Sequence, residues 1–270
     1  MVELENKYKV GVRRFGLINW VGAFTLYKKE VLRFLIVSGQ TLIGPILTSI
    51  LFLVVISLAI GDERGDALGV PYIEFLASGL IMMQVIQQSF SHSSSSLMMS
   101  KMMGTIDDIV NSPLSPAEVT ISIVLASITR GLCIAFISTL IFVFILDLHI
   151  KNYFIWFLYL FLAGFFLGSA GIIAGLYADK FDQMATVTNF IIVPLSFLSG
   201  TFYSIEKLPY ILKSLSYYNP FFHMIDGFRY SFIGQLDGSL KLGISFLLII
   251  SIITWVISYT LFKKGYKIKS

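Results

Sequence analysis

Six long apolar stretches divide this 270-residue sequence, and they constrain its fold more than any other feature. Each holds about 20 or more mostly apolar residues, the length that an α-helix needs to cross the ~30 Å hydrocarbon core of a bilayer. The stretches cover residues 34–60, 73–94, 119–146, 154–178, 184–202 and 242–262. Only 13% of the residues are charged, about half the share in an average soluble domain, which excludes a water-soluble globule. The sequence therefore predicts one all-α integral membrane domain over residues 1–270.

The basic residues gather beside the first and the last apolar stretch. Lys28, Lys29 and Arg33 lie around the start of the first stretch, while Lys263 and Lys264 follow the last. Since lysine and arginine are enriched on the cytoplasmic side of membrane proteins, both termini should be cytoplasmic, which six crossings allow. The same placement explains the formal net charge of +4 without a nucleic-acid partner, because the basic residues form no single stripe.

Two segments outside the apolar stretches have a character of their own. Residues 1–30 combine a cytoplasmic tail with apolar residues among basic ones, a pattern typical of a helix lying in the headgroup layer. Residues 203–238 are as long as a span but contain several charges, each costing about 2.5–3.5 kcal/mol at the bilayer centre. The break at Asn219-Pro220 instead predicts two short extracytoplasmic helices, a re-entrant pair that dips into the outer leaflet before the last span.

Polar side chains recur at helical spacing in the second stretch, and two more lie in the fifth. They are Gln84, Gln87, Gln88, Ser91, Asn189 and Ser196. Polar groups at membrane depth need partners, which either neighbouring helices or the contents of a substrate path can supply. Both interpretations stay open, and interhelical hydrogen bonding is the simpler one at any single residue. Arg130, in the middle of the third stretch, should face protein, a water-filled cavity or the cytoplasmic interface.

The fourth stretch carries glycines on one helical face. Gly164, Gly168, Gly171 and Gly175 follow offsets of four, seven and eleven residues from the first, which permits close approach of another helix backbone. The pattern predicts helix packing first and a seam between two copies of the chain second.

The sequence lacks the motifs of nucleotide and peptide hydrolysis. No phosphate-binding GxxxxGK[ST] loop, HExxH zinc helix or GxSxG elbow occurs. His92, His149 and His223 lie far apart in the sequence, so they do not suggest a shared metal site. We therefore expect a non-catalytic chain with no cofactor or metal, in which any use of ATP requires a separate subunit.

Three parts of the sequence carry the motifs of a known family. The first is GTIDDIVNSPLSP at 104–116, and the second is the pair Arg130-Gly131. The third, at 198–234, contains the pairs Leu208-Pro209 and Asn219-Pro220 and the triplet Gly227-Phe228-Arg229. With the order of the spans, these parts resemble the permease subunits of bacterial ABC-2-type transporters, a group of drug, polysaccharide and lipid-linked glycan exporters. The resemblance covers nearly the whole chain.

The resemblance implies partners and a coupling contact. Such permeases form homodimers or pseudo-dimers of six-helix subunits in the cytoplasmic (inner) membrane, each subunit bound to a cytoplasmic ABC ATPase that holds ATP and Mg. The helix at 104–111 would be the coupling helix on that ATPase, and 179–183 a smaller contact. The implied coupling residues are Gly104, Thr105, Ile106, Asp107, Asp108, Ile109, Asp179 and Asp182.

The resemblance also implies an outer gate formed by the re-entrant pair. The residues placed there are Tyr217, Asn219, Pro220, Phe221 and Arg229. An aromatic belt at the membrane surface is the competing explanation for the aromatic residues around the break.

The expected function is that of an exporter subunit that moves an amphipathic, lipid-linked or drug-like substrate through a path between two copies. Membrane lipid is a further expected partner of the chain. A nucleotide-independent, ion-coupled transporter or a membrane scaffold is the alternative. Against ion coupling, no acidic residue lies well inside a predicted span, since Glu74 and Asp147 are near the ends of theirs.

Overall fold

The structure, a computed structural model, describes residues 18–60, 65–146 and 148–267. Within these residues five helical segments are long and apolar enough to cross a membrane. They are Gly39–Ala59, Pro116–Leu146, Tyr153–Tyr177, Phe181–Leu198 and Leu240–Lys263. The predicted class of all-α membrane protein is confirmed. The remaining predicted span, residues 73–94, lies in α3 (Tyr72–Met102). This helix is long enough to cross a membrane, but its glutamines and serines make it less apolar than the other five, so six crossings remain a prediction.

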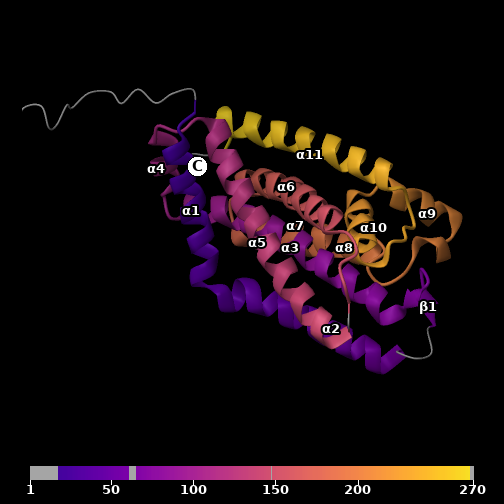
Figure 1. The fold of residues 1–270 in the computed structure, drawn as a ribbon. Helices are drawn as coiled ribbons and strands as arrows, with labels where there is room; N and C mark the ends of the chain where they lie inside the picture. Colours follow the sequence, from indigo (N-terminus) through magenta and orange to yellow (C-terminus); the bar gives the residue numbers. More distant parts are fainter. Residues whose placement is uncertain (1–17, 61–64, 147, 268–270) are drawn as a thin grey trace, which may run out of the picture.

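The chain enters the bundle through α1 (Trp20–Ile36), which lies across one end and meets α2 (Gly44–Ile60) at an angle, as Figure 1 shows. The buried residues of α1 are Leu26, Glu30 and Phe34. Because they follow each other every four residues, the amphipathic pattern continues past Glu30, the predicted end of the interfacial helix. The first span begins at Gly39 rather than residue 34, with a π-helical turn, η1 (Gly39–Ile43). Residues 1–17 of the predicted tail and interfacial helix lie outside the described residues.

Three helices form the centre of the bundle: α3, α5 (Pro116–Leu146) and α6 (Tyr153–Tyr177). The glycine face of α6 lies against the other two. A Cβ added at Gly171 would stand 2.6 Å from the carbonyl oxygen of Phe90, and one at Gly175 would stand 2.8 Å from that of Ser94. Gly164 and Gly168 face α5 in the same way. The packing interpretation is therefore confirmed within the chain, and these glycines are not free to form a seam between copies.

One end of the bundle carries α4 (Ile106–Asn111), which follows directly from α3 and precedes a tight start of α5. At that start, the Ser115 hydroxyl accepts from the Glu118 amide, while the Glu118 carboxylate accepts from the Ser115 amide, at 3.3 and 2.6 Å. The same carboxylate accepts from the amide of Asn19, the N-cap of α1, at 2.6 Å. This capping box, with the bond from Asn19, joins the start of α1 to the start of α5.

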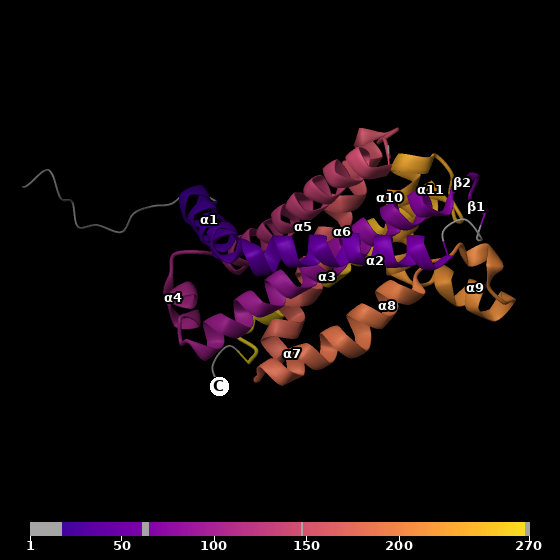
Figure 2. The same cartoon turned by 90° about the horizontal axis from the view of Figure 1, so that it is seen from below.

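The fifth apolar stretch is one long helix in three parts: α7 (Phe181–Val187), the π-helical turn η3 (Thr188–Ile192) and α8 (Val193–Leu198). It lies beside α3, at the edge of the bundle away from α5 (Figure 2).

The opposite end carries the short elements. They are the antiparallel pair β1 (Asp66–Ala67) and β2 (Val70–Pro71), the 3-10 turn η4 (Ile205–Lys207), α9 (Tyr210–Tyr217) and α10 (Pro220–Ile233). The predicted break at Asn219-Pro220 is confirmed, since α9 ends at Tyr217 and α10 begins at Pro220. The chain closes with α11 (Leu240–Lys263) against α6. Figure 2 shows α1 and α4 at one end and α9 with the hairpin at the other.

Candidate functional site

The central helix α3 is covered on all sides but one. Between Phe75 and Ser100 every residue is buried except five, which stay half-buried. These residues, which we call the α3 stripe, are Gln87, Gln88, Ser91, Ser95 and Met99. Their spacing places them on one side of the helix, and all but Met99 are polar. The bundle thus leaves one polar strip of its most buried helix accessible.

Of the six polar residues predicted to line a path, Gln87, Gln88 and Ser91 belong to the α3 stripe, whereas Gln84, Asn189 and Ser196 do not. Gln87 donates to the hydroxyl of Ser196 on α8 at 3.1 Å, which joins the second and fifth apolar stretches. Gln84 is buried above the α3 stripe, with 3% of its surface exposed. Asn189 is exposed on η3.

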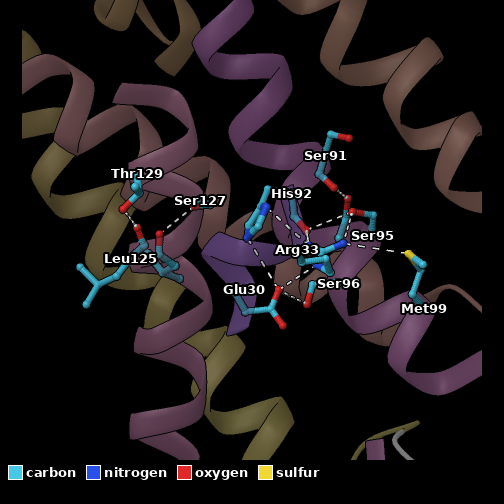
Figure 3. Close-up of polar contacts among 12 residues, drawn as sticks. Glu30, Arg33, Ser91, His92, Ser95, Ser96, Met99, Leu125, Ser127 and Thr129 are labelled. Atoms are coloured by element: carbon cyan, nitrogen blue, oxygen red, sulfur yellow. Dashed lines mark hydrogen bonds and ion pairs between the residues drawn. The ribbon is translucent and has the colours of Figure 1, made fainter. Parts of the chain in front are cut away.

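A charged cluster joins α1 to the α3 stripe, and Figure 3 shows it in close-up. Glu30 is 1% exposed, and its carboxylate accepts from the Ser96 hydroxyl at 2.7 Å and from Arg33 Nε at 3.1 Å. Arg33 also donates to the His92 carbonyl oxygen at 3.0 Å and approaches the Ser95 hydroxyl at 3.5 Å. This cluster fixes the angle of α1 against α3.

Arg130 of α5 reaches the same strip at the level of Gln88. Its guanidinium donates to the side-chain oxygen of Gln88. The residue is 6% exposed, as expected for a basic residue that faces protein at this depth, and its Nε is buried without a hydrogen-bond partner. Among the described residues no carboxylate forms an ion pair with it.

Sequence reasoning missed the cluster around Glu30, although a signal was present. Glu30 occupies the apolar face of α1 four residues from both Leu26 and Phe34, a position where a solvated acid is not expected. Glu30 also bears on the argument against ion coupling, which rested on the absence of an acidic residue inside a predicted span. A buried acid does contact His92 of the second predicted span, although this acid belongs to α1.

The predicted coupling segment forms a helix with two faces. Ile106 and Ile109 of α4 are buried in an apolar cluster with Leu26 of α1 and Leu97 of α3. Asp107, Asp108 and Val110 are exposed on the outer side, and Gly104 before the helix has a φ of +71°. Asp107 and Asp108 also lie in the first turn, where negative charge stabilises a helix.

The second predicted coupling segment is tied to α3 and to the C-terminal end. Lys101 donates to the carbonyl oxygens of Leu176 and Ala178 at 2.9 and 2.8 Å, closing the end of α6. Asp179 accepts from Lys267 at 3.1 Å, and this bond lowers the pKa of its carboxyl group. The carboxylate therefore persists on acidification further than an isolated aspartate would. Asp182 is exposed beside it.

The predicted outer gate is a hydrogen-bonded corner. Asn219 caps α10 by accepting from the Phe221 amide at 3.0 Å and donates to the Ser199 hydroxyl at 2.8 Å. Pro220 and Tyr218 border an apolar hollow of about 490 Å³ between α8 and α9. Phe221 is buried, whereas Tyr217 is 38% exposed.

Arg229, assigned to the same gate, is 1% exposed inside the bundle. It donates to the carbonyl oxygen of Gly200 at 2.7 Å and to that of Phe75 at 3.3 Å, and its guanidinium lies 3.7 Å from the Phe75 ring centre. These are the contacts of an anchor between α10, α3 and the turn after α8. A moving gate residue would not be expected to make them all.

Fold and site together define a multi-pass helical membrane protein with a polar strip along its central helix. Over residues 22–233 the sequence matches the family described as ABC-2 type transporter, and the chain belongs to that family. The resemblance inferred from the motifs is thereby confirmed.

Relatives of known name share nearly the full length. The chain is 31% identical over 251 residues to the Inner membrane transport permease YadH of Escherichia coli strain K12, covering 93% of this chain and 98% of the relative. It is 21% identical over 263 residues to Nodulation protein J of Neorhizobium galegae, covering 92% and 94%. The equivalent protein of Rhizobium leguminosarum bv. viciae is 20% identical over 261 residues.

Proposed function

We propose that this chain is the permease subunit of an ATP-driven exporter in the bacterial inner membrane. Two copies form a path for an amphipathic, lipid-linked or drug-like substrate, and each copy binds a cytoplasmic ABC ATPase. The observation that carries the proposal is the two-faced helix α4, because Ile106 and Ile109 fix it to the bundle while Asp107 and Asp108 face outward.

The position of α4 supports a coupling role. It follows α3 after three residues, so a force on α4 acts directly on the helix that carries the α3 stripe. On the other side of α4 along the chain, the capping box at Ser115 and Glu118 fixes the start of α5. The start of α1 and the end of α11 lie at the end of the bundle that carries α4 (Figure 1), and in the proposed orientation this end, with the second contact at Asp179 and Asp182, is cytoplasmic.

The α3 stripe and its contact with Ser196 of α8 support a path on this side of α3. Two copies that face each other across α3 and α7–α8 would enclose the strip, Asn189 included. The corner at Asn219 and Pro220 would close the outer end, with α9 and α10 dipping into the outer leaflet.

Reversing the charges of α4 tests the coupling contact. In Asp107→Lys/Asp108→Lys we expect association with the ATPase to fall about tenfold, equivalent to ~1.4 kcal/mol, because outward carboxylates are replaced by ammonium groups. The measurement is a pull-down in mild detergent with mass spectrometry of partners and vanadate-sensitive ATPase activity.

The matched control is Asp66→Lys, an exposed aspartate at the opposite end of the bundle. It should leave both readouts at the wild-type level. Unchanged ATPase recovery in the α4 variant would contradict the coupling role, and a wild-type chain isolated without any ATPase would favour the ion-coupled or scaffold alternative.

A further inference from the structure

We infer that the α3 stripe binds an anionic group, a phosphate or carboxylate, carried by the substrate. The binding groups are the guanidinium groups of Arg33 and Arg130. The inference rests on the proposed function, since it names the chemistry of the cargo for the same path.

The two arginines flank the stripe at successive levels. Arg130 donates to Gln88, whereas Arg33 approaches Ser95 at 3.5 Å and the sulfur of Met99 at 4.0 Å. Both therefore touch stripe residues, one from α5 and one from α1, and the side chain of Arg33 remains 27% exposed. A group moving along the stripe would pass both guanidiniums.

The charges of this site do not balance among the residues that the structure describes. Glu30 is the carboxylate that pairs with Arg33, at 3.1 Å, and among the described residues Arg130 pairs with none. His92 lies beside the same carboxylate, with its Nε2 3.8 Å from Glu30, and supplies no anion to the site. A buried unpaired cation is costly, and a bound anion removes that cost.

Arg130 has hydrogen-bonding capacity to spare. Its Nε is buried without a partner, although the residue is more than nine-tenths buried. Guanidinium groups bind phosphate and carboxylate with paired, charge-assisted hydrogen bonds, which an ammonium cannot match in geometry. The arrangement thus favours an oxyanion over a neutral or cationic cargo.

The probe is dodecyl phosphate, with dodecyl maltoside as the neutral amphiphile of equal chain length. Binding is measured by equilibrium dialysis on the full chain in nanodiscs of neutral lipid. We expect Arg33→Gln and Arg130→Gln each to weaken dodecyl phosphate binding about tenfold, and Lys29→Gln, an exposed charge on the same helix as Arg33, to leave it unchanged.

A variant with the opposite sign separates charge from misfolding. Glu30→Gln keeps a hydrogen-bonding side chain of similar shape but removes the carboxylate, so affinity for dodecyl phosphate should rise several-fold. Damage to the fold cannot produce that increase. Arginine variants that bind as wild type does, or a probe that binds no better than dodecyl maltoside, would overturn the inference.

A competition arm identifies the source of the anion. Displacement of the probe by inorganic phosphate at equal concentration supports a free anion as ligand, and failure to displace it supports an oxyanion on an acyl or isoprenoid chain. Because the assay uses the permease alone, loss of ATPase association leaves it unaffected. The anion inference and the proposed function can therefore fail separately.

Discussion

Arg229→Met should deprive the chain of its outer anchor and cause a large loss of stability. The substitution leaves the carbonyl oxygen of Gly200 without the guanidinium donor inside the bundle, whereas that of Phe75 keeps the Ser78 hydroxyl as a donor. An unsatisfied buried carbonyl group costs about 1–3 kcal/mol, so the melting temperature of the detergent-solubilised protein should fall by roughly 5 °C. Fluorescence-detected size exclusion after heating measures it.

Two further variants test whether the loss of stability comes from the hydrogen bonds of Arg229. Arg229→Lys retains the charge but not the fork that reaches two carbonyl groups, and should lie between wild type and Arg229→Met. Lys207→Met removes an exposed positive charge at the same end of the bundle and should melt as wild type does. A wild-type melting temperature for Arg229→Met would reject the anchor and return Arg229 to the predicted gate.

The second large effect is expected from Gly171→Ala/Gly175→Ala. Each new methyl group would stand 2.6–2.8 Å from a backbone carbonyl oxygen of α3, and backbone atoms cannot swing aside as a side chain can. Overpacking of this kind costs about 1–3 kcal/mol per site, so the double variant should be poorly recovered and should melt well below wild type.

The control for the glycine pair is Gly39→Ala. A Cβ added at Gly39, in η1, meets no atom within 4 Å, so this variant should melt close to wild type. Equal behaviour of the control and the double variant would show that α6 can move away from α3 at little cost, against the close packing of these two helices.

The sequence allowed much of the fold to be predicted because its signals are local. Apolar length located the spans, the Asn219-Pro220 pair located the break between α9 and α10, and helical spacing identified the glycine face of α6. The boundary between α1 and the first span could not be located in this way. Residues 34–36 are apolar enough for a span, and only the packing of Phe34 on α5 and against His92 of α3 shows that they continue α1.

The site was predicted less completely, because its key contacts are long-range. The polar side of α3 was recognised from Gln84, Gln87, Gln88 and Ser91. However, the contact of Glu30 with Ser96 joins residues 66 positions apart, and that of Arg130 with Gln88 joins residues 42 positions apart. Periodicity places a residue on a face of its own helix, but it does not tell which helix lies opposite.

The two π-helical turns have a consequence for how the subunit can deform. In η1 and η3 the bonds from the Gly44 amide to the Gly39 carbonyl and from the Val193 amide to the Thr188 carbonyl close five-residue rather than four-residue loops. Such turns are weaker points in a helix and often occur at functional sites. Both lie in spans with little internal cover, whereas α3, α5 and α6 are tightly interlocked. The helices that can bend most easily are therefore the two peripheral ones, η1–α2 and α7–η3–α8. A conformational change should bend these two helices and leave the packing of α3, α5 and α6 unchanged.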